Sequence, residues 1–491
     1  AGLLHDFESG KRNFIGGHGA TPNLMVQGPP GTGKSYSTAF AVFSRLQGAM
    51  REGRDLRVFL SCKTHAATDV LLNNVLAVQE KLAELKAASP GIFKEYFDDR
   101  LLDVPLFRVA PRDRLPDAIR HLAKDSGKGK GATYNADVIC ESPWSVVGVT
   151  PGGVYGMVKA KWKKNLFGHD LCDLLVLDEA SQMNLPEAVM AALGLKQDGQ
   201  LIVVGDHRQM PPIVKHDWDS EGRRTFQQYA VYASLFDSLR KQEPPMIQFA
   251  ESFRLHQTMA EYLRQEVYRH DGIPYHSNRT DVLPDMIIED EMVAAVLKPE
   301  YPLVVVVHDE AASQMRNPYE QNLIQPILHS LTHSTGYGLE PDEGLGIVVP
   351  HRAQRAAMQE AFPELGVMDE ATGLLARSAV DTVERFQGGE RTVILVSATE
   401  SDRAYLLASS KFLLDPRRLT VALSRAKRKM ILVASRTIFS MFSPDEEVFS
   451  NSLLWKNLLS RACTTNLWEG DRHGKQVVVW GGKTAETGNQ S

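Results

Sequence analysis

The sequence predicts an α/β protein made of two successive units, each with a parallel sheet. Short apolar runs that favour strands alternate with helical stretches along most of the 491 residues. The glycine-rich segment GPPGTGKS, residues 28 to 35, follows the first of these runs, and a second alternating series begins near Met246. Such alternation is typical of parallel sheets covered by helices on both faces, with ligands at the carboxyl ends of the strands.

The expected strands fall into two groups. Those of the first unit are residues 23–27, 56–61, 145–149, 173–177 and 201–204, and those of the second are 303–307, 345–349, 380–382, 392–397 and 430–433. We therefore place a first domain at 1–245, a second at 246–440 and a C-terminal appendage at 441–491. The weakly patterned, proline-containing stretch at about 88–141 reads as an insertion in the first domain. The polar stretch 216–228 reads as a surface excursion before a helix at 231–240.

The glycine-rich segment has the spacing of a phosphate-binding loop, GxxxxGK[ST], placed between a strand and a helix. Its glycines let backbone N–H groups turn toward phosphates, Lys34 reaches the β and γ oxygens, and Ser35 holds Mg²⁺. The loop predicted to bind ATP comprises Gly28, Pro29, Pro30, Gly31, Thr32, Gly33, Lys34 and Ser35.

Two further strand ends complete this picture. The run DLLVLDEA ends in adjacent carboxylates, so that Asp178 is expected to bind Mg²⁺ and Glu179 to activate the attacking water. The run LIVVGDHRQMPP places Gln209 on a loop at the same sheet edge, where its amide can sense the γ-phosphate.

Composition narrows the class of protein without naming a substrate. The chain is 43% hydrophobic and 23% charged, with net charge −5, and it contains neither a long apolar span nor a signal-peptide pattern, which favours an intracellular, cytoplasmic or nuclear protein. Four dispersed cysteines do not predict zinc. Two basic patches are equally consistent with solvated faces and with phosphate contact; they comprise Lys159, Lys161, Lys163 and Lys164 around Trp162, and Arg112, Arg114, Arg120, Lys124, Lys128 and Lys130.

Nine segments in order resemble the motifs of superfamily 1 helicases, over about residues 20 to 440. The branch is the 5′-to-3′ one that includes the nonsense-mediated-decay helicase, the senataxin-like enzymes and the Okazaki-fragment nuclease-helicase. The segments are GPPGTGKS, SCKTHAATD, VVGVTPGG, DEAS, GDHRQMPP, SFRLH, VVPHRAQ, VDTVERFQGGE and DPRRLTVALSRAK. The resemblance implies two tandem RecA-like P-loop NTPase domains that act as an ATP-dependent helicase or translocase.

The resemblance also assigns residues of the second domain. It implies that Arg254 and Arg425 are arginine fingers, that Phe253 stacks on adenine, and that Glu390 contacts the nucleotide sugar, while Gln387 and Gly388 couple ATP to nucleic acid. Guanidinium groups suit the finger role because they fork toward phosphoryl oxygens.

The resemblance further implies a track for single-stranded DNA or RNA. Its residues are Thr64, His65, Thr68, Thr150, Pro151, Pro350, His351, Arg352, Thr382 and Val383. Hydroxyls, loop N–H groups and one cation suit backbone contacts that serve DNA and RNA alike. A single threonine of this kind is more often a cap at a strand end, and the prediction depends on their recurrence after successive strands.

Some features depart from the family pattern. Residues 1–26 hold no adenine-reading glutamine and leave no room for the branch's upstream β-barrel and stalk. We therefore expect an excised core whose further domains or protein partners lie outside the chain. Two alternatives to duplex unwinding stay open: an ATP-driven nucleoprotein remodeller, and a nucleotide-gated clamp on nucleic acid.

Overall fold

The computed structural model describes residues 8–125, 133–212, 233–341, 343–368, 375–383, 386 and 389–483, without the side chains of 376 and 411. The chain divides into two compact units, Ala1–Phe249 and Ala250–Ser491. The expected excursion at 216–228 and the pair Gln387 and Gly388 lie outside the described residues.

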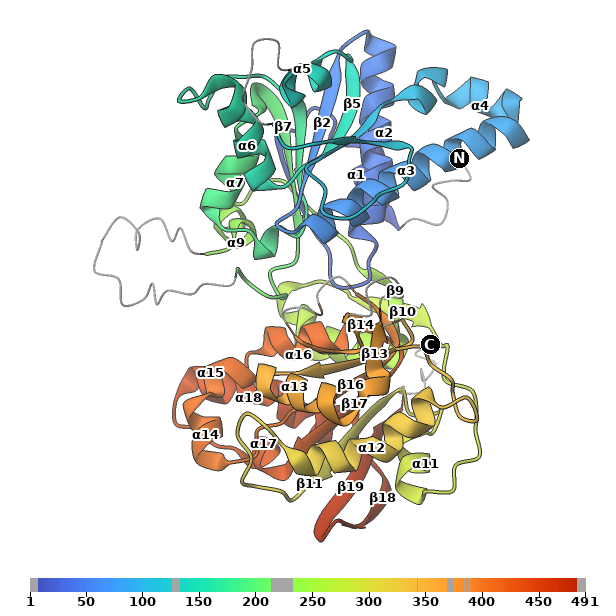
Figure 1. Ribbon diagram of the computed structural model, residues 1–491, viewed down its shortest axis with the longest axis vertical. Coiled ribbons are helices and arrows are strands. Elements are labelled where there is room, and N and C mark those ends of the chain that lie inside the picture. Colours follow the sequence, from blue (N-terminus) through green and yellow to red (C-terminus); the bar gives the residue numbers. More distant parts are fainter. Residues whose placement is uncertain are drawn as a thin grey trace. The chain divides into compact units, whose positions relative to one another are not determined.

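The first unit is built on one parallel sheet (Figure 1). Its strands are β1 (Asn23–Gln27), β2 (Leu56–Ser61), β3 (Leu106–Val109), β4 (Ile119–Leu122), β5 (Trp144–Gly148), β6 (Cys172–Leu177), β7 (Leu195–Gly205) and β8 (Met246–Gln248). Its helices are α1 (Ser9–Gly16), α2 (Lys34–Glu52), α3 (His65–Ala88), α4 (Pro90–Tyr96), α5 (Asn135–Cys140), α6 (Pro151–Trp162), α7 (Leu185–Ala192) and α9 (Leu235–Arg240). The strand order is β4-β3-β5-β2-β6-β7-β1-β8.

Alternating side chains of these strands fill two cores, one on each face of the sheet. Leu174 and Val176 of β6 pack into a core with α1 to α4, whereas Leu175 and Leu177 pack into a second core with α5 to α7 and α9. Figure 1 shows the two helix groups on opposite sides of the sheet. Both faces are therefore buried, as the continuous apolar runs predict for parallel strands.

The stretch that we interpreted as an insertion at 88–141 extends this sheet. β3 pairs with β5, and β4 pairs with β3, both in parallel. These strands are only four residues long and lie among prolines, so their sequence pattern does not distinguish them from loops.

The second unit has its own sheet, in the order β15-β12-β16-β17-β11-β19-β18. The strands of this unit are β9 (Glu251–His256), β10 (His276–Arg279), β11 (Leu303–His308), β12 (Leu345–Val349), β13 (Gly366–Met368), β14 (Leu375–Ser378), β15 (Val380–Thr382), β16 (Arg391–Ser397), β17 (Ala426–Ser435), β18 (Thr465–Arg472) and β19 (Lys475–Gly482). Its helices are α10 (Gln257–Glu266), α11 (Glu291–Leu297), α12 (Pro318–Thr332), α13 (Arg352–Ala361), α14 (Arg403–Ala408), α15 (Ser410–Leu413), α16 (Pro416–Leu423), α17 (Arg436–Ser440) and α18 (Glu446–Asn457).

The expectation of a separate appendage at 441–491 is wrong for the described residues. β19 pairs antiparallel with β11 along its length, and β18 pairs with β19. Val477 and Val479 are buried in the core of the second unit. The polar residues of this hairpin explain why the sequence pattern did not predict it as part of the sheet. Only one face of the two strands packs against the core, so the other face carries polar residues.

Lys429 of β17 is a basic side chain buried in this unit. Its side chain is 1% exposed, and its Nζ donates to the carbonyl oxygens of Lys298 and Tyr301 at 2.9 and 2.7 Å. Burial lowers the pKa of Lys429 to about 7, because removing an ammonium group from water disfavours its charged form.

This burial predicts that stability rises with pH. Between about pH 7 and 10.5 the unfolded chain keeps the Lys429 proton that the folded chain releases, so the free energy of unfolding increases by up to about 1.4 kcal/mol per pH unit. Denaturant unfolding of the wild-type protein and Lys429→Met at pH 7, 8 and 9 measures the difference. Parallel pH profiles for the two proteins would contradict the expectation.

Candidate nucleotide and nucleic-acid sites

The phosphate-binding loop connects β1 to α2 in the order that the sequence predicts. Gly31 and Gly33 have φ of 74° and 73°, a left-handed conformation that side chains rarely adopt. A Cβ on Gly28 would lie 2.6 Å from the Lys34 Cγ. Lys34 folds back over the loop, and its Nζ donates to the Gly28 carbonyl at 2.7 Å. The loop thus places a lysine and the amino end of α2 around one small space.

The expected magnesium ligands lie together. Ser35 Oγ donates to Asp178 Oδ2 at 2.7 Å. Burial raises the pKa of Asp178 to about 6, and the charge of Glu179 acts in the same direction against Ser35 and Lys34. A hydroxyl and a carboxylate beside the phosphate loop fit Mg²⁺, which takes few protein oxygens and keeps waters and phosphate oxygens. No group of three metal-ligating side chains occurs among the described residues.

Glu179 occupies a strained position directly after Asp178. Its φ is 53°, which is unusual for a residue with a side chain, and its Oε2 accepts from Gln182 Nε2 at 3.3 Å. Asp178 N–H donates to the Ser61 carbonyl at the end of β2 at 3.1 Å. The surrounding contacts therefore hold the two carboxylates at the end of β6.

Gln209 is held by a residue that the sequence argument did not single out. Gln209 Nε2 donates to Asp206 Oδ2 at 3.0 Å, and Gln27 Nε2 donates to Asp206 Oδ1 at 2.7 Å. Asp206 is 1% exposed. The position of Asp206 in the sequence could have singled it out, because it directly follows the apolar strand β7. This strand neighbours β1 on one side and β6 on the other. The three nucleotide segments therefore follow three adjacent strands.

The track residues of the first unit follow the next strands along the same edge. Thr64 and His65 come after β2, and Thr150 comes after β5, which pairs with β2 in parallel. Thr64 caps α3 by accepting from Ala67 N–H at 3.2 Å, and its side chain is exposed. Burial and the nearby Arg108 and Arg112 lower the pKa of His65, so its ring is neutral at pH 7.

Other predicted track side chains of this unit are buried. Thr68 is 0% exposed and donates to the Thr64 carbonyl at 2.9 Å, so its hydroxyl stabilises the helix start instead of facing solvent. Thr150 accepts from Gly153 N–H at 3.3 Å as the cap of α6, and Pro151 is buried. Thr150 therefore caps α6, and the Thr68 hydroxyl is used inside the first turn of α3; the role of both residues in a nucleic-acid track stays a prediction.

In the second unit, the predicted track residues lie at the carboxyl ends of the neighbouring strands β12 and β15. Arg352 is exposed and His351 is partly exposed, whereas Pro350, Thr382 and Val383 are buried. His351 Nε2 lies 2.7 Å from Oε1 of the fully buried Glu400, and its ring stacks on Phe412 at 5.5 Å. Glu400 is a second positioning residue without a sequence motif of its own.

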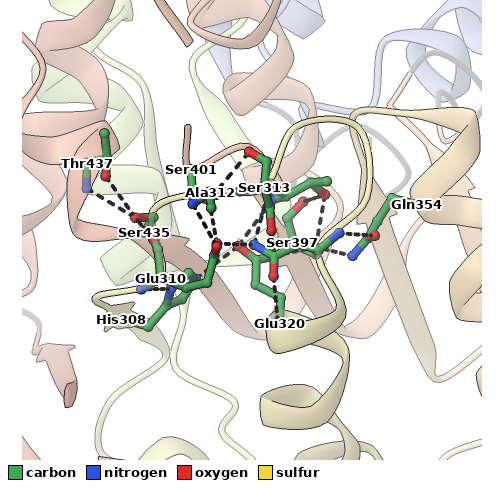
Figure 2. A network of polar contacts seen from close by, with 12 residues as sticks. His308, Glu310, Ala312, Ser313, Glu320, Gln354, Ser397, Ser401, Ser435 and Thr437 are labelled. Carbon is green, nitrogen blue, oxygen red and sulfur yellow. Dashed lines mark hydrogen bonds and ion pairs between the residues drawn. The ribbon is translucent and has the colours of Figure 1, made fainter. Parts of the chain in front are cut away.

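Figure 2 shows the buried polar network at this sheet edge. Glu320 of α12 accepts from Ser397 Oγ at 2.5 Å and lies 3.1 Å from His308 Nε2. Gln354 of α13 donates to Ser397 at 3.2 Å, and Glu310 accepts from the N–H of Ala312 at 2.7 Å. Buried carboxylates with several donors are restrained, so the network joins the ends of β11 and β16 to the helix that carries Arg352.

The expected arginine fingers lie near the opposite ends of β16 and β17, where Arg254 contacts Glu390 and the carbonyl of Ser424. Arg254 is on β9, and Arg425 immediately precedes β17 and is 4% exposed. The carbonyl of Arg425 accepts from Arg391 N–H at 2.9 Å, and Glu390 directly precedes Arg391 in the sequence. Phe253 is 47% exposed, as a stacking surface requires. The second unit therefore separates its proposed nucleotide residues from its track residues along the strands.

Known proteins match both units. Two family models, each described as an AAA domain, match residues 15–215 and 231–437. With the phosphate loop and carboxylates on adjacent parallel strands, these matches define a P-loop NTPase with two tandem RecA-like domains. The chain belongs to the superfamily 1 helicases, in the branch that contains DNA2 and the regulators of nonsense transcripts. The predictions of fold class and family are confirmed.

Individual relatives are distant. The mouse DNA replication ATP-dependent helicase/nuclease DNA2 is 25% identical over 87% of this chain and 37% of its own length. A regulator of nonsense transcripts 1 homolog from Neurospora crassa is 22% identical over 90% of this chain and 37% of its own length. The chain thus spans little more than a third of these relatives. The solved PRRSV helicase is 13% identical, with a TM-score of 0.36, over 96% of this chain and 60% of that chain.

None of the described helices has the length and hydropathy to cross a bilayer.

The basic patch around Trp162 makes contacts inside the protein, since Lys161 pairs with Asp137 and lies 4.7 Å from the Trp162 ring. In the other patch, Lys128 and Lys130 fall outside the described residues.

Proposed function

We propose that this chain is an ATP-hydrolysing motor core that moves 5′ to 3′ along single-stranded nucleic acid and unwinds duplexes inside the cell, in the cytoplasm or nucleus. The observation that carries the proposal is the adjacency of the phosphate loop, Asp178 and Gln209 at the ends of β1, β6 and β7. The predicted track segments follow β2 and β5 at the same edge.

Each candidate nucleotide-site residue of the first unit has one proposed role. Lys34 binds the β and γ oxygens of ATP, and Ser35 and Asp178 hold Mg²⁺, which neutralises phosphate charge when bound. Glu179 accepts a proton from the attacking water as the new bond to the γ-phosphorus forms and the bond to the ADP oxygen breaks. Gln209, held by Asp206, contacts the γ-phosphate.

The second unit contributes cations. We propose that Arg254 and Arg425 stabilise the charge that develops on the transferred phosphoryl group. Phe253 would stack on the adenine ring. His351 and Arg352 would contact the nucleic-acid backbone together with Thr64 and His65 of the first unit. Contacts with the backbone do not recognise the base sequence, and they can be made with both DNA and RNA.

The test compares ATP hydrolysis with single-stranded DNA and single-stranded RNA of equal length and salt, together with strand displacement on duplexes carrying a 5′ or a 3′ overhang. We expect nucleic-acid-stimulated hydrolysis and displacement from the 5′ overhang. Lys34→Met should abolish both, and Lys475→Met serves as a charge-matched control. Hydrolysis without strand displacement would favour protein removal, which a streptavidin-displacement assay measures; no hydrolysis on either nucleic acid would leave only the clamp.

A further inference from the structure

A short turn between α6 and β6 carries basic and aromatic side chains that the proposed function does not use. Lys163, Lys164 and Phe167 of this turn are exposed, and Phe167 is 67% exposed. Lys159, in the last turn of α6, is exposed as well. We call these four residues the turn surface.

The backbone of the turn has a fixed shape. Lys163 N–H donates to the Lys159 carbonyl at 3.0 Å, and Asn165 N–H donates to the Trp162 carbonyl at 3.1 Å. The His169 ring stacks on the Trp162 indole with the ring centres 3.9 Å apart, and His169 Nε2 donates to the Asn165 carbonyl at 2.9 Å. A ligand of the turn surface therefore has little chain to order when it binds.

The stability of the turn does not explain two of these side chains. Lys163 has φ of 55° and ψ of −100°, a conformation that glycine adopts freely and lysine adopts only with strain. Phe167 leaves most of its ring in water, so burial contributes little to keeping a phenylalanine there. Only Lys159 is explained by its place, because cations are favoured at the carboxyl end of a helix.

The charges around the turn favour an anionic ligand. Lys161 is paired with Asp137, and the exposed Asp170 follows the turn. The three lysines of the turn surface outweigh Asp170 by two charges, although the chain as a whole has net charge −5. Ammonium groups bind phosphates, and an exposed ring beside them stacks on an unpaired base. The combination fits single-stranded nucleic acid.

The turn surface lies at the far end of the helix that begins beside the predicted track. α6 starts after Thr150, where β5 ends, and leads back to the start of β6, which is parallel to β2 as β5 is. The 12 residues of α6 span about 18 Å. A single strand that leaves the track along α6 therefore meets Lys159 first and the turn next.

We propose that the turn surface is a second contact site for single-stranded nucleic acid, beyond the predicted track, where the three lysines bind phosphates and Phe167 stacks on an unpaired base. The inference rests on the proposed function, because it requires that the chain binds a single strand. The site adds affinity for a long strand without selecting its sequence or its sugar, since phosphates and base faces are common to DNA and RNA.

The test measures the Kd of the protein for fluorescent single strands of about 8 and about 20 nucleotides over a series of salt concentrations. For Phe167→Ala we expect the Kd for the longer strand to rise about 5- to 100-fold, the usual effect of losing one stacked base. Phe167→Tyr keeps the ring and should restore binding, whereas Phe167→Leu should not. Lys164→Met should reduce the slope of log Kd against log salt by about 0.7. Both losses should be smaller for the shorter strand.

Lys163→Gly separates binding from folding. Glycine relieves the strained conformation at this position, so the thermal unfolding midpoint should stay at or above the wild-type value. The Kd for the longer strand should nevertheless rise about fivefold, because a phosphate contact is lost.

Lys94→Met is the matched control, since it removes an exposed lysine of α4 on the opposite face of the sheet. It should change neither the Kd nor the salt slope. An unchanged Kd in Phe167→Ala, an unchanged slope in Lys164→Met, or losses that are equal for the two strand lengths would overturn the proposal. A wild-type protein whose ATP hydrolysis no single strand stimulates would instead overturn the proposed function.

Discussion

Glu179→Gln is expected to lower the ATP turnover number by about 10²- to 10⁴-fold, the usual contribution of a general base, while ATP still binds. The amide keeps the size of the side chain and the contact with Gln182, but it cannot accept a proton from water. Steady-state hydrolysis gives kcat, and fluorescence titration with a nucleotide analogue gives the Kd.

The matched control for this variant is Glu80→Gln, which makes the same change at an exposed position of α3. It should leave kcat and the Kd at their wild-type values. Turnover of Glu179→Gln within about threefold of the wild-type protein would remove Glu179 as the general base.

Arg425→Ala should reduce turnover by about 10³-fold or more, the effect typical of an arginine finger. The residue is buried, so alanine also removes packing, and Arg425→Lys is the sharper test. Lysine keeps the charge but cannot fork toward two phosphoryl oxygens. We expect Arg425→Lys to recover only a small part of the lost rate, with the Kd for ADP unchanged.

Arg264→Ala controls for the loss of an arginine in the same unit, because Arg264 pairs only with neighbours on α10 in the contacts described. A thermal unfolding midpoint measured for each variant separates a loss of fold from a loss of catalysis. Full activity in Arg425→Lys would show that charge alone is needed and would exclude a forked contact.

The sequence predicted the central strands because their burial leaves a direct pattern. β1, β2 and β12 begin and end at the expected residues, because apolar runs bounded by polar residues are typical of strands that are buried on both faces. The edge strands β4 and β18 escaped prediction. Their half-exposed faces carry residues such as Arg120 and Glu469, and their pairing depends on distant partners that local composition does not specify.

The site shows the same division. Motif spacing correctly predicted that Lys34, Ser35 and Asp178 lie close together. Their proximity follows from a short loop and from the ends of strands in one parallel sheet. The residues that hold motif side chains were not predicted: Asp206 and Glu400 act through contacts that only the folded chain brings together. The burial of Thr68 was also not predicted, because it depends on packing, and the residue type at a motif position does not show whether the side chain is buried. The catalytic and binding roles of the individual residues stay predictions.

The hydrogen bond from Asp178 N–H to the Ser61 carbonyl has a mechanical consequence. It joins the strand that ends at the proposed metal ligand to the strand that leads to Thr64, and neighbouring strands are about 4.8 Å apart. Lys63 adds a second link, since its Nζ donates to the Gln182 carbonyl just beyond Glu179 at 3.0 Å. A displacement of the Asp178 peptide can therefore reach the Thr64 loop across a single strand spacing, without a hinge inside the sheet.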